Sequence, residues 1–281
     1  MRIVKTNKTL LALIPNVVTT VEGETPLIDK IEQWLLAAED WVTNTFTGDT
    51  IMDDLDKAPS SEMWRHTASL VVCEALRNAI PSLDVVLTPN GFGIVSNSNV
   101  APASKDRVER LINQMATQRD AFINLLLRDL RQSEDWRETE QYAWFSSSLL
   151  QSPKACVAGA ADRIRDGKQW DTFLQLRERA ILIEDAIAEK WISPEVMTQL
   201  RTVLLNTALQ PTAHQVALKV RSCVFQELRG NPRNHWDLDR IVNFIRHNGD
   251  VFPAWETSET AKLYNEPTVF RNKKDSPGYF F

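Results

Sequence analysis

The side chains that most often act as catalytic bases or nucleophiles are rare and scattered in this chain of 281 residues. Nucleophilic catalysis needs a Ser or Cys beside a histidine and a carboxylate, and no G-x-S-x-G motif surrounds a serine here. The histidines stand in unrelated sequence contexts, at His66, His214, His235 and His247. Without an HExxH motif or a cluster of Cys and His, the pattern predicts no metal site and no cofactor site. We therefore expect a protein that is not an enzyme.

Two further groups of reactive side chains favour structural interpretations. The acidic segment 49–56 contains Asp53, Asp54 and Asp56, but it lacks the central Gly and the closing Glu of a calcium-binding EF-hand. We expect a solvated loop there. The cysteines are odd in number and form no CxxC pair, at Cys73, Cys156 and Cys223. We expect them to be buried thiols in a reducing compartment.

The charge balance argues against a dedicated nucleic-acid binder, because such proteins usually carry a basic excess and this chain has a formal net charge of −5. Arginines between residues 119 and 137 alternate with acidic residues, which is typical of an exposed, charge-balanced helix face. The apolar run at residues 10–14 is too short for a signal peptide, and no other stretch is long enough to cross a bilayer. The sequence therefore predicts no membrane partner and no specific binding of DNA.

Most of the chain shows apolar residues at three- and four-residue steps, the spacing of an amphipathic helix. This spacing predicts helices at residues 25–46, 60–80, 104–131, 170–191, 194–204, 212–229 and 237–247. Between the second and third helices, two short apolar runs flank Pro89-Asn90-Gly91, whose Asn and Gly tolerate the positive φ of a tight turn. Each half has a long aromatic-bearing helix followed by further helices, which could mean a duplication, although the residue matches are too few to establish one.

The fold class that follows is mainly α, a helical bundle with one β-hairpin at about 83–96 and extended N- and C-terminal arms. We expect an extended N-terminal arm at 1–24, a helical domain with the hairpin at 25–132, a second helical region at 133–266 and an extended C-terminal docking arm at 267–281. The chain ends in Tyr279, Phe280 and Phe281, and such an apolar end is expected to be covered by its own chain or by a neighbour.

Two stretches carry a resemblance to phage proteins. Residues 27–48, LIDKIEQWLLAAEDWVTNTFTG, resemble the first helix of tailed-phage head–tail connector (adaptor) proteins, in which a helix with an Ala-Glu-x-aromatic step ends in Thr-Gly. Residues 81–108, PSLDVVLTPNGFGIVSNSNVAPASKDRV, resemble a largely uncharacterised family from phages and prophages of Bacteroidales gut bacteria. The connector likeness covers only about the first 130 residues, and the chain is longer than the small adaptors.

This resemblance implies a virion structural protein at the neck, the head–tail junction, that is present in the host cytoplasm during assembly. It implies binding to the portal protein and to tail or tail-adaptor proteins, and self-association into a ring of about twelve copies. DNA would pass nearby without being specifically bound, which suits an acidic subunit because like charges repel.

The residues expected to make protein contacts are apolar side chains of the hairpin and of the C-terminal arm: Phe92, Ile94, Phe270, Tyr279, Phe280 and Phe281. The alternative function, which the sequence leaves open, is a host-side helical binding or regulatory module that works as a monomer.

Overall fold

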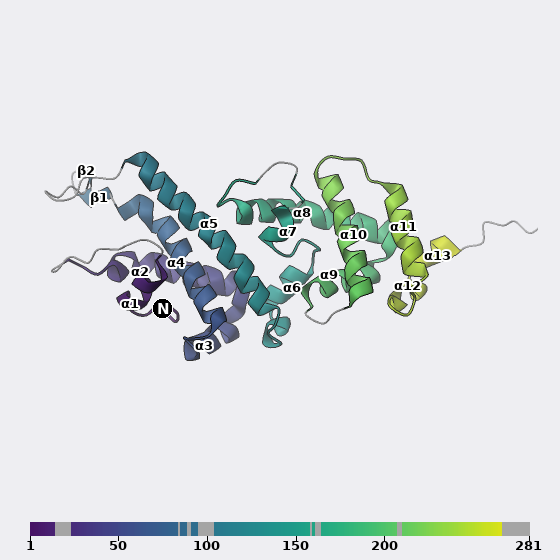
Figure 1. Ribbon diagram of the computed structural model, residues 1–281, viewed down its shortest axis with the longest axis horizontal. Coiled ribbons are helices and arrows are strands. Elements are labelled where there is room, and N and C mark those ends of the chain that lie inside the picture. Colours follow the sequence, from purple (N-terminus) through teal and green to yellow (C-terminus); the bar gives the residue numbers. More distant parts are fainter. Residues whose placement is uncertain are drawn as a thin grey trace, which may run out of the picture.

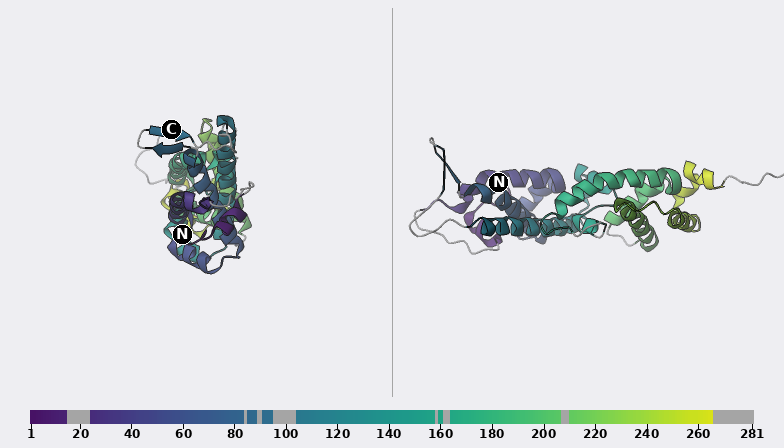
Figure 2. Two further views of the ribbon diagram at one scale, coloured as in Figure 1. Left: turned by 90° about the vertical axis from the view of Figure 1, so that its left-hand side faces the viewer. Right: turned by 90° about the horizontal axis from the view of Figure 1, so that it is seen from above.

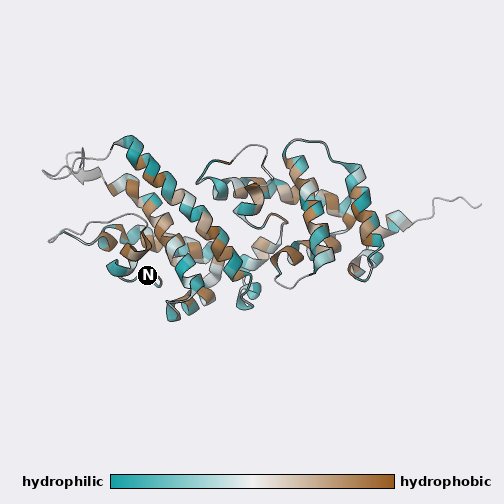
Figure 3. Cartoon of the chain, in the orientation of Figure 1, coloured by the Kyte–Doolittle hydropathy of each residue, from teal (hydrophilic) through white to brown (hydrophobic). Residues whose placement is uncertain are grey.

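The computed structural model is an elongated helical body. It describes residues 1–14, 24–83, 85–88, 91–94, 104–157, 159–160, 164–206 and 210–265. The helices of the first half gather at one end and those of the second half at the other, in both the front view and the view from above (Figures 1 and 2). The long helices carry both hydrophobic and hydrophilic stretches, as amphipathic helices do (Figure 3).

Helix α4 is the centre of the first half. The helices there are α1 (Asn7–Leu13), α2 (Leu27–Val42), α3 (Gly48–Lys57), α4 (Glu62–Leu83), α5 (Lys105–Leu130) and α6 (Glu140–Ser146), with a π-helical segment η1 (Thr43–Thr47) and a 3-10 segment η2 (Asp135–Glu138). Helix α4 packs against both α2 and α5. Its buried residues run without a break from His66 to Leu76, so this helix is enclosed on all sides over that stretch.

The second half is built from shorter helices. They are α7 (Pro153–Val157), α8 (Gln169–Ile187), α9 (Pro194–Leu205), α10 (Pro211–Leu228), α11 (His235–Arg246), α12 (Pro253–Thr257) and α13 (Glu259–Asn265), with a π-helical segment η3 (Ala188–Ile192). Helix α10 packs against α8, α9 and α11. No helix in the described part of the chain is both long and apolar enough to span a membrane.

The expected fold, a helical bundle with a β-hairpin at about 83–96 and extended arms at both ends, needs correction. The mainly α class holds, because the described core comes from helices and the segments beside them. The hairpin and the N-terminal arm are the parts that differ. Leu83, the expected first residue of the hairpin, is the last residue of α4. Strand pairing among the described residues is limited to β1 (Val85–Thr88) and β2 (Gly91–Ile94), an antiparallel pair with no third strand.

The expected extended N-terminal arm is wrong. Residues 7–13 form α1, and the segment before it lies on the body with Ile3 and Val4 buried. The carboxylate of Glu39 accepts the main-chain N–H groups of Arg2 (2.8 Å) and Ile3 (3.1 Å). Because a main chain bound to a buried carboxylate is fixed in place, this segment is part of the fold. The expected C-terminal arm, residues 267–281, lies outside the described residues.

The expected acidic loop at 49–56 is also wrong, because these residues belong to α3. Its carboxylates face the N-terminal segment, where Arg2 pairs with Asp49 and Asp53 at 3.0 Å each and Lys5 pairs with Asp56 at 2.5 Å. The acidic side chains therefore help to hold the N-terminus on the helix.

The two halves repeat one order of elements. Each begins with two buried apolar residues, a short helix and a long helix, and each long helix continues into a five-residue π-helical segment. Residues 39–55, EDWVTNTFTGDTIMDDL, correspond to residues 184–200, EDAIAEKWISPEVMTQL. The residue after each π-helical segment has positive φ, 73° at Gly48 and 79° at Ser193. We call residues 1–146 the first module and residues 147–265 the second module.

The ends of the modules match as well. Trp136 and Trp255 are both buried, and each is followed three residues later by a hydroxyl, of Thr139 or Ser258, that donates to the tryptophan carbonyl at 2.7 Å. The same hydroxyl oxygens cap the next helix, α6 or α13. The repeat thus divides the chain between residues 146 and 147, whereas the sequence led us to expect a division between 132 and 133.

Candidate functional site

Of the six residues expected to make contacts, the structure describes the main chain of two. Phe92 and Ile94 belong to β2, where the main chain of Phe92 pairs with Leu87 and that of Ile94 with Val85. Their side chains lie outside what the structure describes. Phe270, Tyr279, Phe280 and Phe281 lie beyond the described residues, so all six assignments stay predictions.

The buried histidine and several buried charged groups have structural partners. No group of three or more His, Cys, Asp or Glu side chains in the described ranges could hold a metal ion. His66 of α4 contacts Asp129 of α5 at 2.5 Å, and Arg128 pairs with the same carboxylate at 2.9 Å. Burial raises the pKa of the Cys73 and Cys156 thiols to about 12, so neither is a nucleophile near neutral pH.

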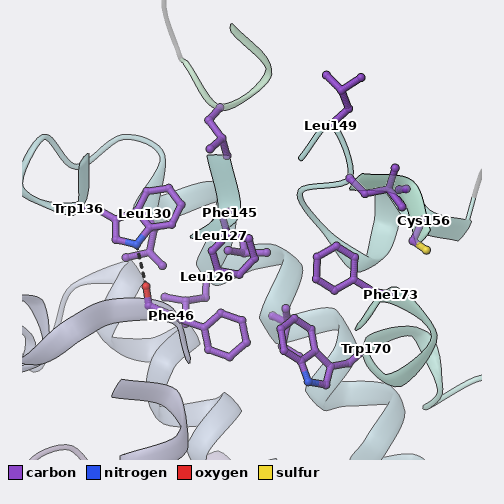
Figure 4. Close-up of a cluster of buried hydrophobic side chains, with 14 of the residues drawn as sticks. Phe46, Leu126, Leu127, Leu130, Trp136, Phe145, Leu149, Cys156, Trp170 and Phe173 are labelled. Atoms are coloured by element: carbon purple, nitrogen blue, oxygen red, sulfur yellow. Dashed lines mark hydrogen bonds between the residues drawn. The ribbon is translucent and has the colours of Figure 1, made fainter. Parts of the chain in front are cut away.

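The best-defined site is the joint between the modules, an aromatic cluster that joins η1, η2 and α6 to the start of α8 (Figure 4). The ring of Phe46 lies 5.1 Å from that of Trp170 and 6.0 Å from that of Phe145, between ring centres. Phe173 lies 5.3 Å from Trp170, and Trp136 lies 6.0 Å from Phe145. All five side chains are buried, so the modules share one core at this joint.

Polar contacts fix the direction in which α8 leaves the joint. Asp120 of α5 accepts the main-chain N–H of Gln169 at 2.8 Å, at the N-terminus of α8 where a carboxylate is favourable. Arg119 is also buried, pairs with Asp120 at 2.8 Å and donates to the Gly167 carbonyl at 3.3 Å. These contacts tie the first module to the first turn of the second.

Arg177 closes the outer side of the joint. Its guanidinium lies 3.8 Å from the ring centre of Trp144, donates to the Trp144 carbonyl, and donates to the Ser147 hydroxyl at 2.9 Å. Burial lowers the pKa of Arg177 to about 10, against the opposing effect of Glu184. The arginine therefore stays charged at neutral pH while it covers an aromatic ring.

A buried carboxylate in each module holds the segment that leads into it. In the second module Glu184 accepts the Leu149 N–H at 3.0 Å, the Ser148 hydroxyl at 2.9 Å and Arg201 at 2.8 Å. Glu39 does the same for the N-terminal segment. Burial raises the pKa of Glu184, although Arg201, Ser148 and Leu149 each act to lower it. Both carboxylates are buried and bind groups of the chain itself, so we assign them a structural role.

The far end of the second module presents exposed apolar side chains. Trp236 of α11 is 66% exposed and Leu263 of α13 is 71% exposed. Arg240 lies 4.5 Å from the ring centre of Trp236. Trp and Arg are enriched at protein interfaces, so this end has the composition of a contact surface. The sequence pattern gives no sign of this surface, because Trp236 and Leu263 are distant in the chain and single exposed side chains carry no periodic signal.

A groove of about 820 Å³ lies between α10 and α11. Its lining combines apolar side chains with cations and amides and includes Lys219, Cys223, Gln226, Asp237, Arg240 and Phe244. The groove adjoins the far end, because Arg240 belongs to both.

Comparison with known proteins gives one match. A family model described as a family of unknown function (DUF6712) matches residues 14–146, a little under half of the chain. The match ends at the last residue of α6, where the first module ends. No curated protein and no solved structure matches the chain.

Proposed function

We propose that this chain is a virion structural protein, a head–tail connector that joins the portal to the tail in a phage particle. The observation that carries the proposal is the arrangement of the body, an elongated pair of modules fixed together by a buried joint. An adaptor must transmit position from one partner to another, and a joint made of interlocked aromatic rings resists bending because packed cores do not deform continuously.

The surfaces of the two ends support a role in protein contacts. Exposed Trp236 and Leu263 lie at the far end, while the ribbon of β1 and β2 follows α4 at the other (Figure 1). The buried charged groups pair within the body and serve its cohesion. The resemblance of residues 27–48 and 81–108 to phage proteins adds the virion setting, with the portal and tail components as partners.

Removal of the C-terminal segment tests the proposal. A chain that lacks residues 267–281 is expected to fold, because the described body ends before them, and to enter particles poorly. The measurement is the ratio of this chain to the major capsid protein in purified particles, with circular dichroism of the purified variant as the folding control. Normal incorporation of the truncated chain would contradict the docking role of this segment.

Deletion of the whole gene from the phage tests the connector role itself. Heads without attached tails are expected in electron micrographs, and expression of the intact chain from a plasmid should restore complete particles. Tailed, infectious particles in the absence of the chain would exclude a connector.

The groove between α10 and α11 favours a second candidate, a monomeric helical binding or regulatory module. A groove of about 820 Å³ lined by both apolar and polar side chains has the size of a site for a helix or a small ligand. Native mass measurement of the chain with portal protein separates the two functions. Complexes with the portal support the connector, and their absence in both purified mixtures and particles supports the module.

A further inference from the structure

The groove between α10 and α11 changes character along its length. A short connection joins the two helices, so they run in opposite directions and line the groove side by side (Figure 1). Two contacts fix how they pair. The Nζ atom of Lys219 lies 5.4 Å from the ring centre of Phe244, and burial together with the charge of Asp237 raises the pKa of Cys223. The groove therefore has an apolar end, formed by Val216 and Phe244, and its other end lies at the connection.

The charged side chains of the groove follow a definite order from the connection to the apolar end. Asp237 comes first, and the side-chain amide of Asn234 donates to its carboxylate at 2.7 Å. Arg240 and Lys219 follow, each one helical turn further along its helix. Each of these cations lies over an aromatic ring, and neither forms an ion pair within the described part of the chain. The groove thus presents an acid, then two cations that lack a counter-ion, then an apolar wall.

The described chain ends near the entrance of this groove. Tyr264, close to the end of α13, donates its hydroxyl to the Lys190 carbonyl at 3.4 Å. The next residue, Trp191, has its ring centre 5.2 Å from that of His235, which directly follows the groove residue Asn234. The segment that continues from α13 therefore starts beside the connected end of the groove, where the acid lies.

That segment, residues 266–281, carries charges and apolar groups in a matching order. A basic stretch at 271–274 is followed by Asp275, and an aromatic stretch lies at 279–281. Bases, an acid and apolar rings thus meet the acid, the bases and the apolar end of the groove in the same order. Residues 266–273 span up to about 27 Å when extended, so the segment is long enough to enter the groove from this side.

We propose that residues 271–281 dock in the groove of their own chain. Asp275 then lies between Lys219 and Arg240, and the aromatic stretch packs against Phe244. The groove, with a volume of about 820 Å³, has room for these side chains. A short tether gives an effective concentration of about millimolar, so weak contacts are enough to keep the segment docked. A partner that binds the segment has to displace it from the groove. The proposal does not depend on a role in a virion.

The reactivity of Cys223 measures whether the groove is occupied, because this half-buried thiol lines it. In the full chain, Asp275→Lys should increase the rate of reaction of Cys223 with iodoacetamide about tenfold, and so should removal of residues 267–281. The rates of Cys73 and Cys156, which the body buries, should stay the same. Cys223 still reacts first in every chain, because the segment leaves the groove far more readily than the body unfolds.

The dependence on protein concentration separates docking within one chain from contact between chains. The rate for the unchanged protein should be constant over about a hundredfold range of concentration. Protection of Cys223 that grows with concentration would mean that a second copy fills the groove, and this result would overturn the proposal. So would a rate that neither change to the segment alters.

A synthetic peptide of residues 267–281, amidated at its C-terminus, gives an independent test on the truncated chain. Calorimetry should show one-to-one binding, and the peptide should slow the reaction of Cys223 again. Lys219→Glu should weaken this binding about tenfold or more, because it places a carboxylate opposite Asp275. The peptide with Asp275→Lys should bind poorly to the truncated chain and regain affinity for its Lys219→Glu variant.

Lys154→Glu in α7 is the matched control for the charge reversal. Lys154 is exposed, as Lys219 is, and forms no ion pair with the residues that the structure describes, but it lies outside the groove. This variant should bind the peptide as the unchanged truncated chain does, and circular dichroism should show the same fold for all variants. A peptide that does not bind, or that binds the Lys219→Glu variant equally well, would overturn the proposal.

Discussion

The indole N–H of Trp136 donates to the main-chain carbonyl of Phe46 at 2.7 Å, and the two residues are separated by 90 positions in the sequence. Both side chains are fully buried. The carbonyl belongs to η1, and the indole comes from η2 just beyond α5. This hydrogen bond therefore connects the π-helical end of α2 with the segment that leads to the second module.

Substitution of Trp136 is expected to lower the free energy of unfolding, because it removes this hydrogen bond. Trp136→Phe removes the donor and leaves the buried Phe46 carbonyl without it, which should lower the free energy of unfolding by about 1–3 kcal/mol. Trp136→Ala adds a cavity and should lower it by about 3–5 kcal/mol. Urea unfolding followed by circular dichroism measures both. Trp236→Phe is the control, since Trp236 is exposed and its replacement should change stability by less than about 0.5 kcal/mol.

The repeat predicts a stabilising substitution at Ser193. This residue has φ 79° and ψ 146°, a region that favours glycine, and its equivalent is Gly48 with φ 73° and ψ 167°. A strained non-glycine residue costs of order 1–3 kcal/mol. Ser193 also caps α9 by accepting the Val196 N–H, but replacing a serine cap by glycine costs only about a few tenths of a kcal/mol. Ser193→Gly should therefore raise the free energy of unfolding by about 1 kcal/mol.

The reciprocal change, Gly48→Ser, is expected to destabilise the protein. A Cβ atom at Gly48 would lie 3.1 Å from the Gln141 side-chain oxygen in addition to the strain of the positive φ. Thermal melts of both variants beside the unchanged chain provide the comparison. Equal shifts of the same sign for the two substitutions would show that the two positions are not equivalent.

Sequence reasoning found the long helices because their buried stripes repeat at helical spacing, as in α5, where Ile123, Leu126 and Leu130 are fully buried. It did not find the N-terminal contact, because Glu39 binds main-chain N–H groups that every residue offers. The acidic side chains of α3 suggested a loop since their partners, Arg2 and Lys5, come from a distant segment. Tertiary contacts of this kind override local propensity.

Local sequence patterns also did not predict the joint between the modules. The stretch from Trp136 to Phe145 is rich in aromatic residues, but it is divided between a short 3-10 segment and a short helix. Each piece is too short to show a recognisable helical periodicity. The two halves have few identical residues, and what they share is the order of helices, the two buried glutamates and the positive φ at Gly48 and Ser193. These features are conformational and become visible only in the structure.

The raised pKa of Glu184 predicts a dependence of stability on pH. A carboxyl group whose pKa is higher in the folded protein than in the unfolded chain stabilises the fold fully below the unfolded pKa, and this contribution is lost as the pH rises through the folded pKa. Compared with Glu184→Gln, which does not titrate, the unchanged protein should lose stability as the pH rises above about 4.3. Urea unfolding between acid and neutral pH measures the difference.

The neighbouring carboxylate supplies the control for that series. Asp185 pairs with the same arginine, Arg201, at 2.9 Å, but its side chain is 54% exposed. Exposed ion pairs contribute about 0–1 kcal/mol, so Asp185→Asn should change stability little at any pH. A stability difference between the unchanged protein and Glu184→Gln that is independent of pH would contradict the raised pKa.

The three thiols are expected to react in a fixed order with iodoacetamide. Cys73 and Cys156 are buried and have pKa values raised to about 12, so they should react only when the protein opens. Cys223 is half-buried in the groove between α10 and α11, and both burial and the nearby charge of Asp237 raise its pKa. It should react first, and faster as the pH rises, because the thiolate is the reacting form.

Removal of the charge beside Cys223 tests one of the two causes of its raised pKa. Asp237→Asn should lower the pKa of the thiol and increase the labelling rate at a given pH, since the carboxylate disfavours the thiolate. Peptide mass mapping of samples quenched at intervals gives the rate for each cysteine, and Cys223→Ser should remove the fastest phase. If Cys156 is labelled as fast as Cys223 in the folded protein, the packing of α7 against α8 is looser than its buried contacts indicate.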